Sequence, residues 1–225
     1  MTCAVYHLGL TEYSRAYDLQ KRLLSLRVEG EIADTLLLLE HPPTITVGRF
    51  GKYENILASR EKLVEAGISL FSTDRGGDVT YHGPGQLVGY PIINLRRRGM
   101  GIRHYVNALE EVIIGVLKSF SIAADRNNGY SGVRVREEEV AAIGLSIKRW
   151  VSMHGFALNV NTNLNNFSFI NPCGFSDRKI TSISRLLAQD LPMDAVTEKL
   201  LACFSEVFKT DIEIRSDSEL VRCFS

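Results

Sequence analysis

The sequence has few cysteines, and they lie far apart. Cys3, Cys173, Cys203 and Cys223 form no C-x-x-C pair, which argues against a zinc knuckle or a redox-active dithiol. Reduced thiols in a cytoplasmic protein fit this pattern best. We therefore expect a cytoplasmic location and no metal site.

Net charge and long apolar runs are also absent. The chain carries 26 basic and 26 acidic residues, so its formal net charge is zero. Proteins that bind nucleic acid over a broad surface are usually basic, so we expect no nucleic-acid partner. The first residues lack the basic and apolar regions of a signal peptide, and no apolar segment is long enough to span a bilayer. We therefore expect no membrane association.

What is present suits one globular domain. Hydrophobic residues make up 45% of the 225 residues, which is enough for a substantial core. No repeat or low-complexity linker divides the chain, so we expect residues 1–225 to form a single domain.

The periodicity of apolar residues predicts a mixture of helices and strands. A helix capped by Thr11 is expected to run to about Val28, with Gly30 beyond its end. A second, short helix is expected over 59–66, and a longer one has its apolar face between Tyr105 and Phe120. Strands are expected over 35–40, 44–47, 68–71 and 87–93, and several more lie between 122 and 160. This pattern is typical of an α/β or α+β domain.

The most unusual stretch runs from Arg75 to Tyr90 and contains five glycines in sixteen residues. Glycine allows another molecule to approach the backbone closely, so the stretch is predicted to form the floor of a binding site. Neither the dinucleotide pattern G-x-G-x-x-G nor a P-loop is present there. A common nucleotide-binding loop is therefore excluded.

This stretch resembles the signature of the lipoyl(octanoyl) transferase family. It reads R-G-G-x-x-T-x-H-G-P-G-Q-x-x-x-Y from Arg75 to Tyr90. The similarity extends from Glu40 through Cys173, which is most of the chain. The resemblance implies the biotin and lipoate protein ligase fold, in which a mixed sheet has flanking helices.

The resemblance also implies an activity and partners. The family transfers an octanoyl group from octanoyl-acyl carrier protein to a lysine of a lipoyl domain. Such domains belong to 2-oxoacid dehydrogenases and to the glycine cleavage H protein. Cys173 falls at the position of the cysteine that carries the acyl group as a thioester, and a thiolate suits that role. A thioester donor is already activated, so no ATP and no other cofactor is expected.

Substrate-binding residues follow from the resemblance by position, in three segments. A slot for an eight-carbon chain should be apolar and lined by small residues. The second and third segments have this composition. The expected substrate-binding residues are Arg75, Gly76, Gly77, Asp78, Val79, Thr80, Tyr81 and His82, then Ala142, Ile143 and Gly144, and finally Gly155, Phe156 and Ala157.

One position departs from the family. Glu139 stands where the family has a lysine that lowers the pKa of the acylated cysteine. A carboxylate near Cys173 would raise that pKa instead, unless a cation such as Lys148 or Lys179 compensates. Two alternatives therefore remain beside the transferase: a non-catalytic or weakly active protein that binds acyl groups or lipoyl domains, and an ATP-dependent lipoate ligase.

Three further interpretations concern side chains outside these segments. Arg96, Arg97 and Arg98 are predicted to form a basic patch that docks an acidic carrier protein. His41, beside two prolines, is interpreted as a structural turn residue in preference to a ligand contact. His154 is interpreted as a satisfied structural histidine in preference to a catalyst.

Overall fold

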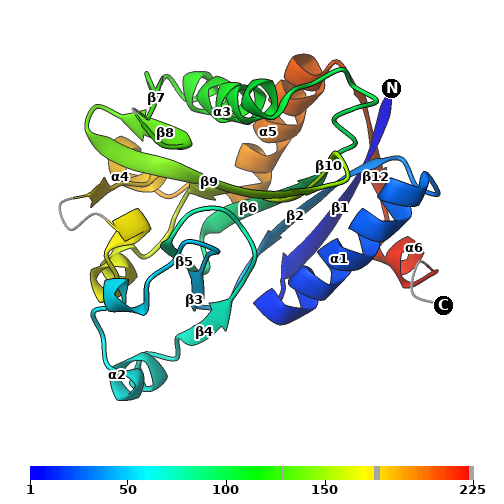
Figure 1. Ribbon diagram of the computed structural model, residues 1–225. Coiled ribbons are helices and arrows are strands. Elements are labelled where there is room, and N and C mark those ends of the chain that lie inside the picture. Colours follow the sequence, from blue (N-terminus) through cyan, green and yellow to red (C-terminus); the bar gives the residue numbers. More distant parts are fainter. Residues whose placement is uncertain (128, 175–177, 223–225) are drawn as a thin grey trace.

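The chain is built on one large mixed sheet (Figure 1), seen in a computed structural model that describes residues 1–127, 129–174 and 178–222. The strand order is β12-β1-β2-β6-β10-β9-β8-β7, and β11 pairs with β9. Three pairs are parallel, namely β1 with β12, β1 with β2 and β9 with β11. The strands of this sheet are β1 (Thr2–Leu10), β2 (Asp34–Glu40), β6 (Gln86–Ile92), β7 (Asp125–Arg126), β8 (Gly132–Val135), β9 (Glu138–Lys148), β10 (Val151–Asn159), β11 (Lys179–Ile180) and β12 (Asp211–Arg215).

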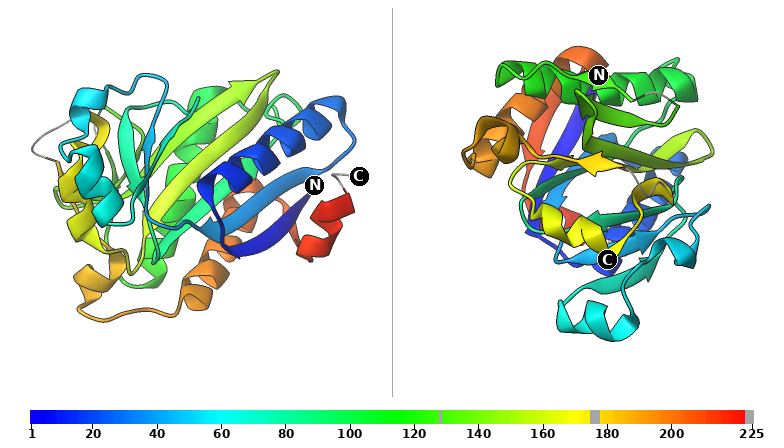
Figure 2. Two further views of the ribbon diagram at one scale, coloured as in Figure 1. Left: turned by 90° about the horizontal axis from the view of Figure 1, so that it is seen from below. Right: turned by 90° about the vertical axis from the view of Figure 1, so that its left-hand side faces the viewer.

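A second, smaller sheet lies beside the first (Figures 1 and 2). It contains β4 (Ser69–Ser72), β3 (Thr44–Val47) and β5 (Val79–His82) in that order. Its own small core includes Ile45, Val79 and Tyr81. The helical segments nearby are η1 (Tyr53–Asn55), α2 (Arg60–Glu65), η2 (Leu164–Phe169) and η3 (Pro172–Gly174).

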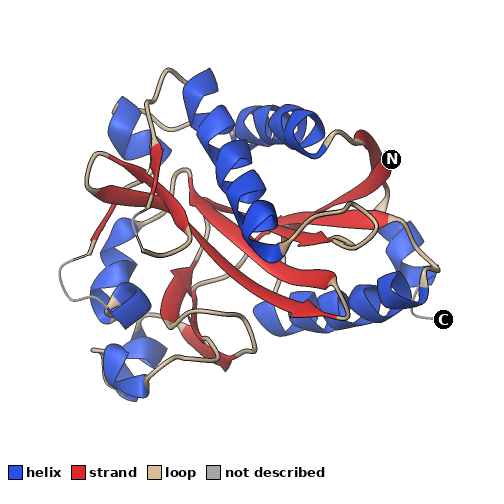
Figure 3. Ribbon diagram, turned by 45° about the horizontal axis from the view of Figure 1, so that its top comes forward, coloured by secondary structure: helices blue, strands red, loops and turns tan. Residues whose placement is uncertain are grey.

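Helices cover both faces of the large sheet (Figure 3). On one face lie α3 (Ile102–Ser119) and α5 (Met193–Phe208), and on the other lies α1 (Tyr13–Glu29). Two short helices, α4 (Ile183–Leu187) and α6 (Asp217–Arg222), complete the fold. The predicted mixed α/β class is therefore confirmed.

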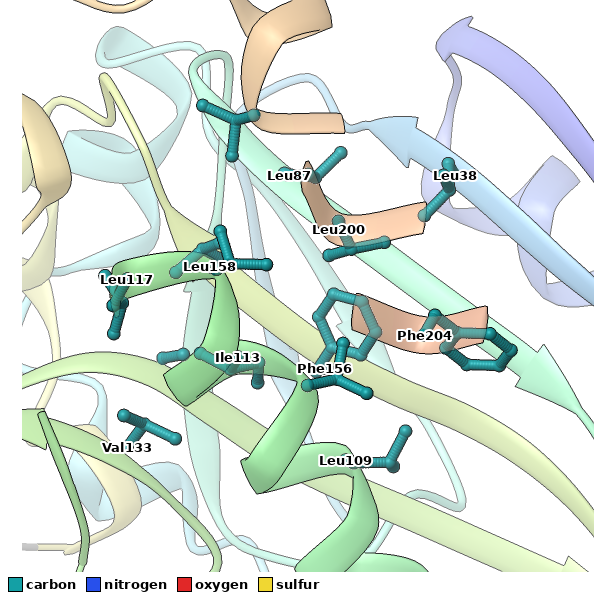
Figure 4. Close-up of a cluster of buried hydrophobic side chains, with 14 of the residues drawn as sticks. Leu38, Leu87, Leu109, Ile113, Leu117, Val133, Phe156, Leu158, Leu200 and Phe204 are labelled. Carbon is teal, nitrogen blue, oxygen red and sulfur yellow. The ribbon is translucent and has the colours of Figure 1, made fainter. Parts of the chain in front are cut away.

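The apolar run of β2 shows why its strand could be predicted. Leu36 and Leu38 belong to the core under α3 and α5, whereas Leu37 and Leu39 belong to the core under α1. Successive side chains of a strand point to opposite faces, so a strand covered on both sides is apolar throughout. Figure 4 shows Leu38 in the first of these cores, among side chains of β6, β10, α3 and α5.

The helix ends agree only in part with the sequence prediction. Gly30 adopts the left-handed conformation after α1 and its N–H bonds to the Leu26 carbonyl, as expected for a C-terminal glycine. Thr11 does not cap this helix, because its hydroxyl donates to the Leu8 carbonyl and the N-cap residue is Glu12. Ser59 does cap α2, accepting from the Lys62 N–H.

The predicted basic patch is wrong for Arg98. Its side chain is 5% exposed, and it bonds to Asp34, to the Phe208 carbonyl and to Thr210. Arg27 bonds to the same carboxylate at 2.8 Å. Two buried cations share one buried carboxylate, so Arg98 joins β2 to the end of α5 and is not available for docking.

Among the described residues, no helix combines the length and the apolar character needed to cross a membrane.

Candidate functional site

Three segments that lie far apart in the sequence meet around one cavity. The cavity is lined by eleven of the fourteen expected substrate-binding residues. Two of the segments lie on neighbouring strands, β9 and β10, since Ala142 pairs with Ala157 and Gly144 with Gly155. The lining residues from the three segments are Arg75, Gly76, Gly77, Thr80, His82, Ala142, Ile143, Gly144, Gly155, Phe156 and Ala157.

The other three expected residues do not line this cavity. Val79 and Tyr81 are fully buried in the small core, and the Tyr81 hydroxyl accepts from Asn166 at 2.7 Å. They lie on a strand, β5, where Thr80 and His82 face the cavity, and side chains alternate along a strand. The Asp78 carboxylate instead accepts from the Lys52 N–H and the Asn55 amide.

Arg75 holds in place the start of the glycine-rich stretch, residues 75–78, here called the glycine loop. Its buried guanidinium donates to the Thr46 carbonyl and hydroxyl and to the Asp78 carbonyl, at 2.7 to 3.1 Å. These bonds tie the loop to β3. Arg75 is therefore a positioning residue for the cavity wall, whatever ligand the cavity takes.

Small residues are needed where this loop crosses β9. The Gly76 N–H donates to the Leu145 carbonyl at 2.8 Å. A Cβ atom added to Gly144 would lie 3.0 Å from the Gly76 carbonyl oxygen, and Gly77 has φ of +90°. Glycine adopts that conformation without strain, which explains why the loop can pass so close to the strand.

The cavity also has lining residues that the sequence did not indicate. Tyr13, on the helix predicted to run to about Val28, and Ser131 both line the cavity, together with Tyr90 and His154. Tyr13 is the first residue of α1 and is 3% exposed. The only sequence signal for it was an apolar position on that helix, and this does not distinguish a core residue from a cavity wall.

His154 is not the satisfied histidine that was expected. Its Nε2 lies 2.8 Å from the Asp74 carboxylate, but its buried Nδ1 has no hydrogen-bond partner among the described residues. Burial lowers its pKa, while Asp74 acts in the opposite direction. The backbone has φ of +59°, which is unusual for a non-glycine residue. If the ring is neutral and donates from Nε2, the lone pair on Nδ1 has no hydrogen-bond donor among the described residues.

His41 matches the structural interpretation. It is fully buried, with Nδ1 2.6 Å from the Thr11 carbonyl and Nε2 2.7 Å from the Tyr90 hydroxyl. Burial lowers its pKa to about 4, so the ring is neutral at pH 7. The Nδ1–H then donates to Thr11, and Nε2 accepts from Tyr90.

The candidate nucleophile Cys173 lies in η3, but its side chain is outside the part of the chain that the structure describes. The backbone on either side of it lies against η1 and the glycine-rich stretch. The Asn171 N–H donates to the Asn55 carbonyl, and a Cβ added to Gly174 would lie 2.8 Å from the Asp78 carboxylate. This 3-10 turn therefore adjoins the glycine loop at Asp78, the residue after the cavity-lining Gly77.

Glu139 is buried and paired. Its carboxylate is 3.2 Å from Arg178 and accepts from Asn127, and Arg178 lies over the Tyr130 ring. Burial raises the Glu139 pKa to about 7, although Arg178 and Asn127 oppose this. Lys148 and Lys179, the cations suggested by sequence, are exposed. Arg178 is thus the cation that pairs with Glu139. An effect of Glu139 on the pKa of the Cys173 thiol stays a prediction.

No group of three or more potential metal ligands comes together among the described residues. The cavity instead combines small and aromatic walls with a few buried histidines.

Known proteins resemble this chain over almost its whole length. It matches a family model described as the lipoyl protein ligase A/B catalytic domain over residues 12–205. It is 50% identical over 222 residues to the octanoyltransferase of Caldicellulosiruptor saccharolyticus, covering 98% of this chain and 94% of that protein. It is 52% identical over 209 residues to the octanoyltransferase of Alkaliphilus metalliredigens, covering 92% and 96%.

Solved structures share the fold at low sequence identity. A lipoate-protein ligase A bound with ATP superposes with a TM-score of 0.79 at 17% identity, covering 99% of this chain and 93% of that one. Biotin protein ligase from Aquifex aeolicus, in complex with biotin and ATP, gives a TM-score of 0.57 at 15% identity, covering 93% and 71%. The expected biotin and lipoate protein ligase fold is therefore confirmed.

Proposed function

The chain belongs to the lipoyl protein ligase A/B catalytic-domain family, and from that premise we propose that it moves an octanoyl group onto a lysine of a lipoyl domain. Curated relatives at about half identity over nearly the whole chain are octanoyltransferases, so the protein is an acyltransferase. The proposed donor is octanoyl-acyl carrier protein. The proposed acceptors are the lipoyl domains of 2-oxoacid dehydrogenases and the glycine cleavage H protein.

The observation that carries this proposal is the shape and chemistry of the cavity. Along one wall lie Ala142, Gly144, Gly155 and Ala157, which have either a methyl side chain or none. Such a wall leaves room for a thin apolar chain, and burying it contributes about 0.8 kcal/mol per methylene. The side chains of Tyr13, Tyr90 and His154, each at most 4% exposed, bound the cavity elsewhere.

The proposed reaction is a double displacement at Cys173. The thiolate attacks the carbonyl carbon of the octanoyl thioester, and the bond from that carbon to the carrier sulfur breaks. The carrier leaves as a thiolate, which takes up a proton. The neutral amine of the acceptor lysine then attacks the acyl-enzyme and forms an amide, loses a proton, and releases the Cys173 thiolate.

The first step exchanges one thioester for another, and the second exchanges a thioester for an amide. Neither step therefore needs ATP. The donor thioester supplies the activation, and the acyl-enzyme is again a thioester. A ligase on the same fold would instead have to activate a free acid, which requires ATP. The two reactions can therefore be distinguished by what each consumes.

The test is intact-mass analysis after incubation with octanoyl-acyl carrier protein, without ATP. The expected result is one covalent octanoyl group on the wild-type chain, removed by hydroxylamine and absent in Cys173→Ala. Cys203→Ala is the matched control, since Cys203 lies half-buried on α5. Reversible binding without an adduct, a strict need for ATP, or an adduct that persists in Cys173→Ala would each refute the proposal.

A further inference from the structure

An open apolar groove continues from the cavity to the surface. Five residues line both the cavity and this groove, namely Gly76, Gly77, Ser131, Ile143 and Gly144. The groove, here called the mouth groove, is further lined by Phe50, Ile102, Val106, Tyr130, Leu145 and Ile147. A molecule that inserts a group into the cavity past these shared residues would contact the mouth groove.

The rim of the mouth groove exposes large apolar side chains. Phe50 is 71% exposed and Ile102 is 52% exposed. They come from different elements, a loop after β3 and the first residue of α3. Large exposed apolar side chains that gather at a groove are typical of a protein-binding surface, whereas isolated ones are common on any protein.

The apolar rim is held rigidly. The Arg49 N–H donates to the Arg75 carbonyl, and the Phe50 N–H donates to the Gly77 carbonyl. The loop that carries Phe50 is therefore fastened to the glycine loop of the cavity. Because Ile102 begins a long helix, both apolar side chains stand on fixed backbone, which reduces the entropy lost when a partner binds.

Cations flank these apolar residues. Arg49 precedes Phe50 and Arg103 follows Ile102, and both are exposed. Lys148 is exposed too, but it follows Ile147 on β9, where successive side chains point to opposite faces of the sheet. None of the three takes part in an ion pair among the described residues. The acidic lining residue, Asp78, has its carboxylate bound by the Lys52 N–H and the Asn55 amide. Two exposed arginines thus stand next to the apolar rim residues Phe50 and Ile102.

We propose that the mouth groove and its cationic rim dock an acidic carrier protein that delivers the acyl thioester. The apolar side chains pack against the carrier where its acyl-bearing arm emerges, and Arg49 and Arg103 face its carboxylates. The arm then passes the shared glycines into the cavity. This inference rests on the proposed acyl transfer, and it places the carrier at a surface other than the arginines of residues 96–98.

The test compares two octanoyl donors, the carrier-bound thioester and the small thioester of N-acetylcysteamine. The variant Phe50→Ser with Ile102→Ser should lower kcat/KM for the carrier-bound donor about tenfold or more, as expected for central contacts of an interface. It should leave kcat/KM for the small thioester within about twofold. The control pair is Val64→Ser with Ile214→Ser, two side chains of similar exposure that line neither the groove nor the cavity.

Charge is tested separately. Arg49→Gln with Arg103→Gln should weaken carrier-bound turnover at low salt and reduce its dependence on ionic strength, because rim charges are screened by salt. Lys118→Gln, at the other end of α3, is the control. Equal loss with both donors, or no loss with the carrier-bound donor in either double variant, would overturn the docking proposal. No turnover of either donor by the wild type would refute the proposed function instead.

Discussion

Removing the buried charge of Glu139 should change how the stability of this protein depends on pH. The carboxylate lies between Arg178 and Asn127, and burial raises its pKa from 4.5 to about 7. Between these two pH values the folded protein keeps a proton that the unfolded chain has already lost. This group therefore stabilises the fold fully below pH 4.5, and that contribution is lost as the pH rises to about 7.

The magnitude follows from linkage. Each pH unit in that window lowers the free energy of unfolding by about 1.36 kcal/mol for one proton. From pH 4.5 to about 7 the loss amounts to about 3 kcal/mol. Glu139→Gln keeps the size of the side chain and resembles the protonated carboxyl, so this part of the pH dependence should disappear. The variant should therefore match the wild type near pH 4.5 and be more stable than the wild type by about 3 kcal/mol at pH 7.

The assay is urea unfolding at half-unit steps from pH 4.5 to 7.5, for the wild type and the variant. Other titrating groups contribute equally to both curves, so their difference isolates Glu139. Glu137→Gln is the control, because it removes the same charge from a side chain that is 83% exposed. Parallel wild-type and Glu139→Gln curves would show that the buried carboxyl keeps an ordinary pKa, and the reasoning would fail. Glu139→Lys should be destabilised at every pH, since it places a second cation against Arg178.

Two further predictions concern the cavity and the core. Ala142→Leu should fill the slot and lower octanoyl transfer from either donor at least tenfold. Ala202→Leu, on the exposed side of α5, is the control and should leave transfer unchanged. Unchanged transfer in folded Ala142→Leu would exclude this wall from binding the acyl chain. Asp34→Ala should lower the free energy of unfolding by about 3 to 5 kcal/mol, because it leaves Arg27 and Arg98 as unpaired buried charges, and a loss below about 1 kcal/mol in urea unfolding would contradict that assignment.

The segments that the resemblance indicated lie around one cavity. The glycine-rich stretch, the small residues of β9 and the segment from Gly155 to Ala157 are all recognisable in the sequence alone, and eleven of their fourteen residues line one cavity. Apolar periodicity predicted β2, β3, α2 and α3 within a few residues. These features depend on local spacing, which a sequence shows directly.

Other features were missed because they depend on partners remote in the chain. The strand β5 was interpreted as loop, and without that strand its alternation could not show that Val79 and Tyr81 face away from the cavity. The strand β1 and the edge strand β12 were also not predicted, and they pair with each other although they come from opposite ends of the chain. The type of a residue alone does not show which face of a strand its side chain lies on.

The sequence by itself therefore determined the kind of site and the segments that build it, because glycine conformations and apolar spacing are local properties. Only the tertiary structure decided the environment of each charge. Asp74 meets His154 across 80 residues, and Arg178 meets Glu139 across 39. Burial and such distant partners set a pKa and decide whether a cation is free to dock, so Arg98 proved internal while Arg49 and Arg103 stand exposed at the mouth groove.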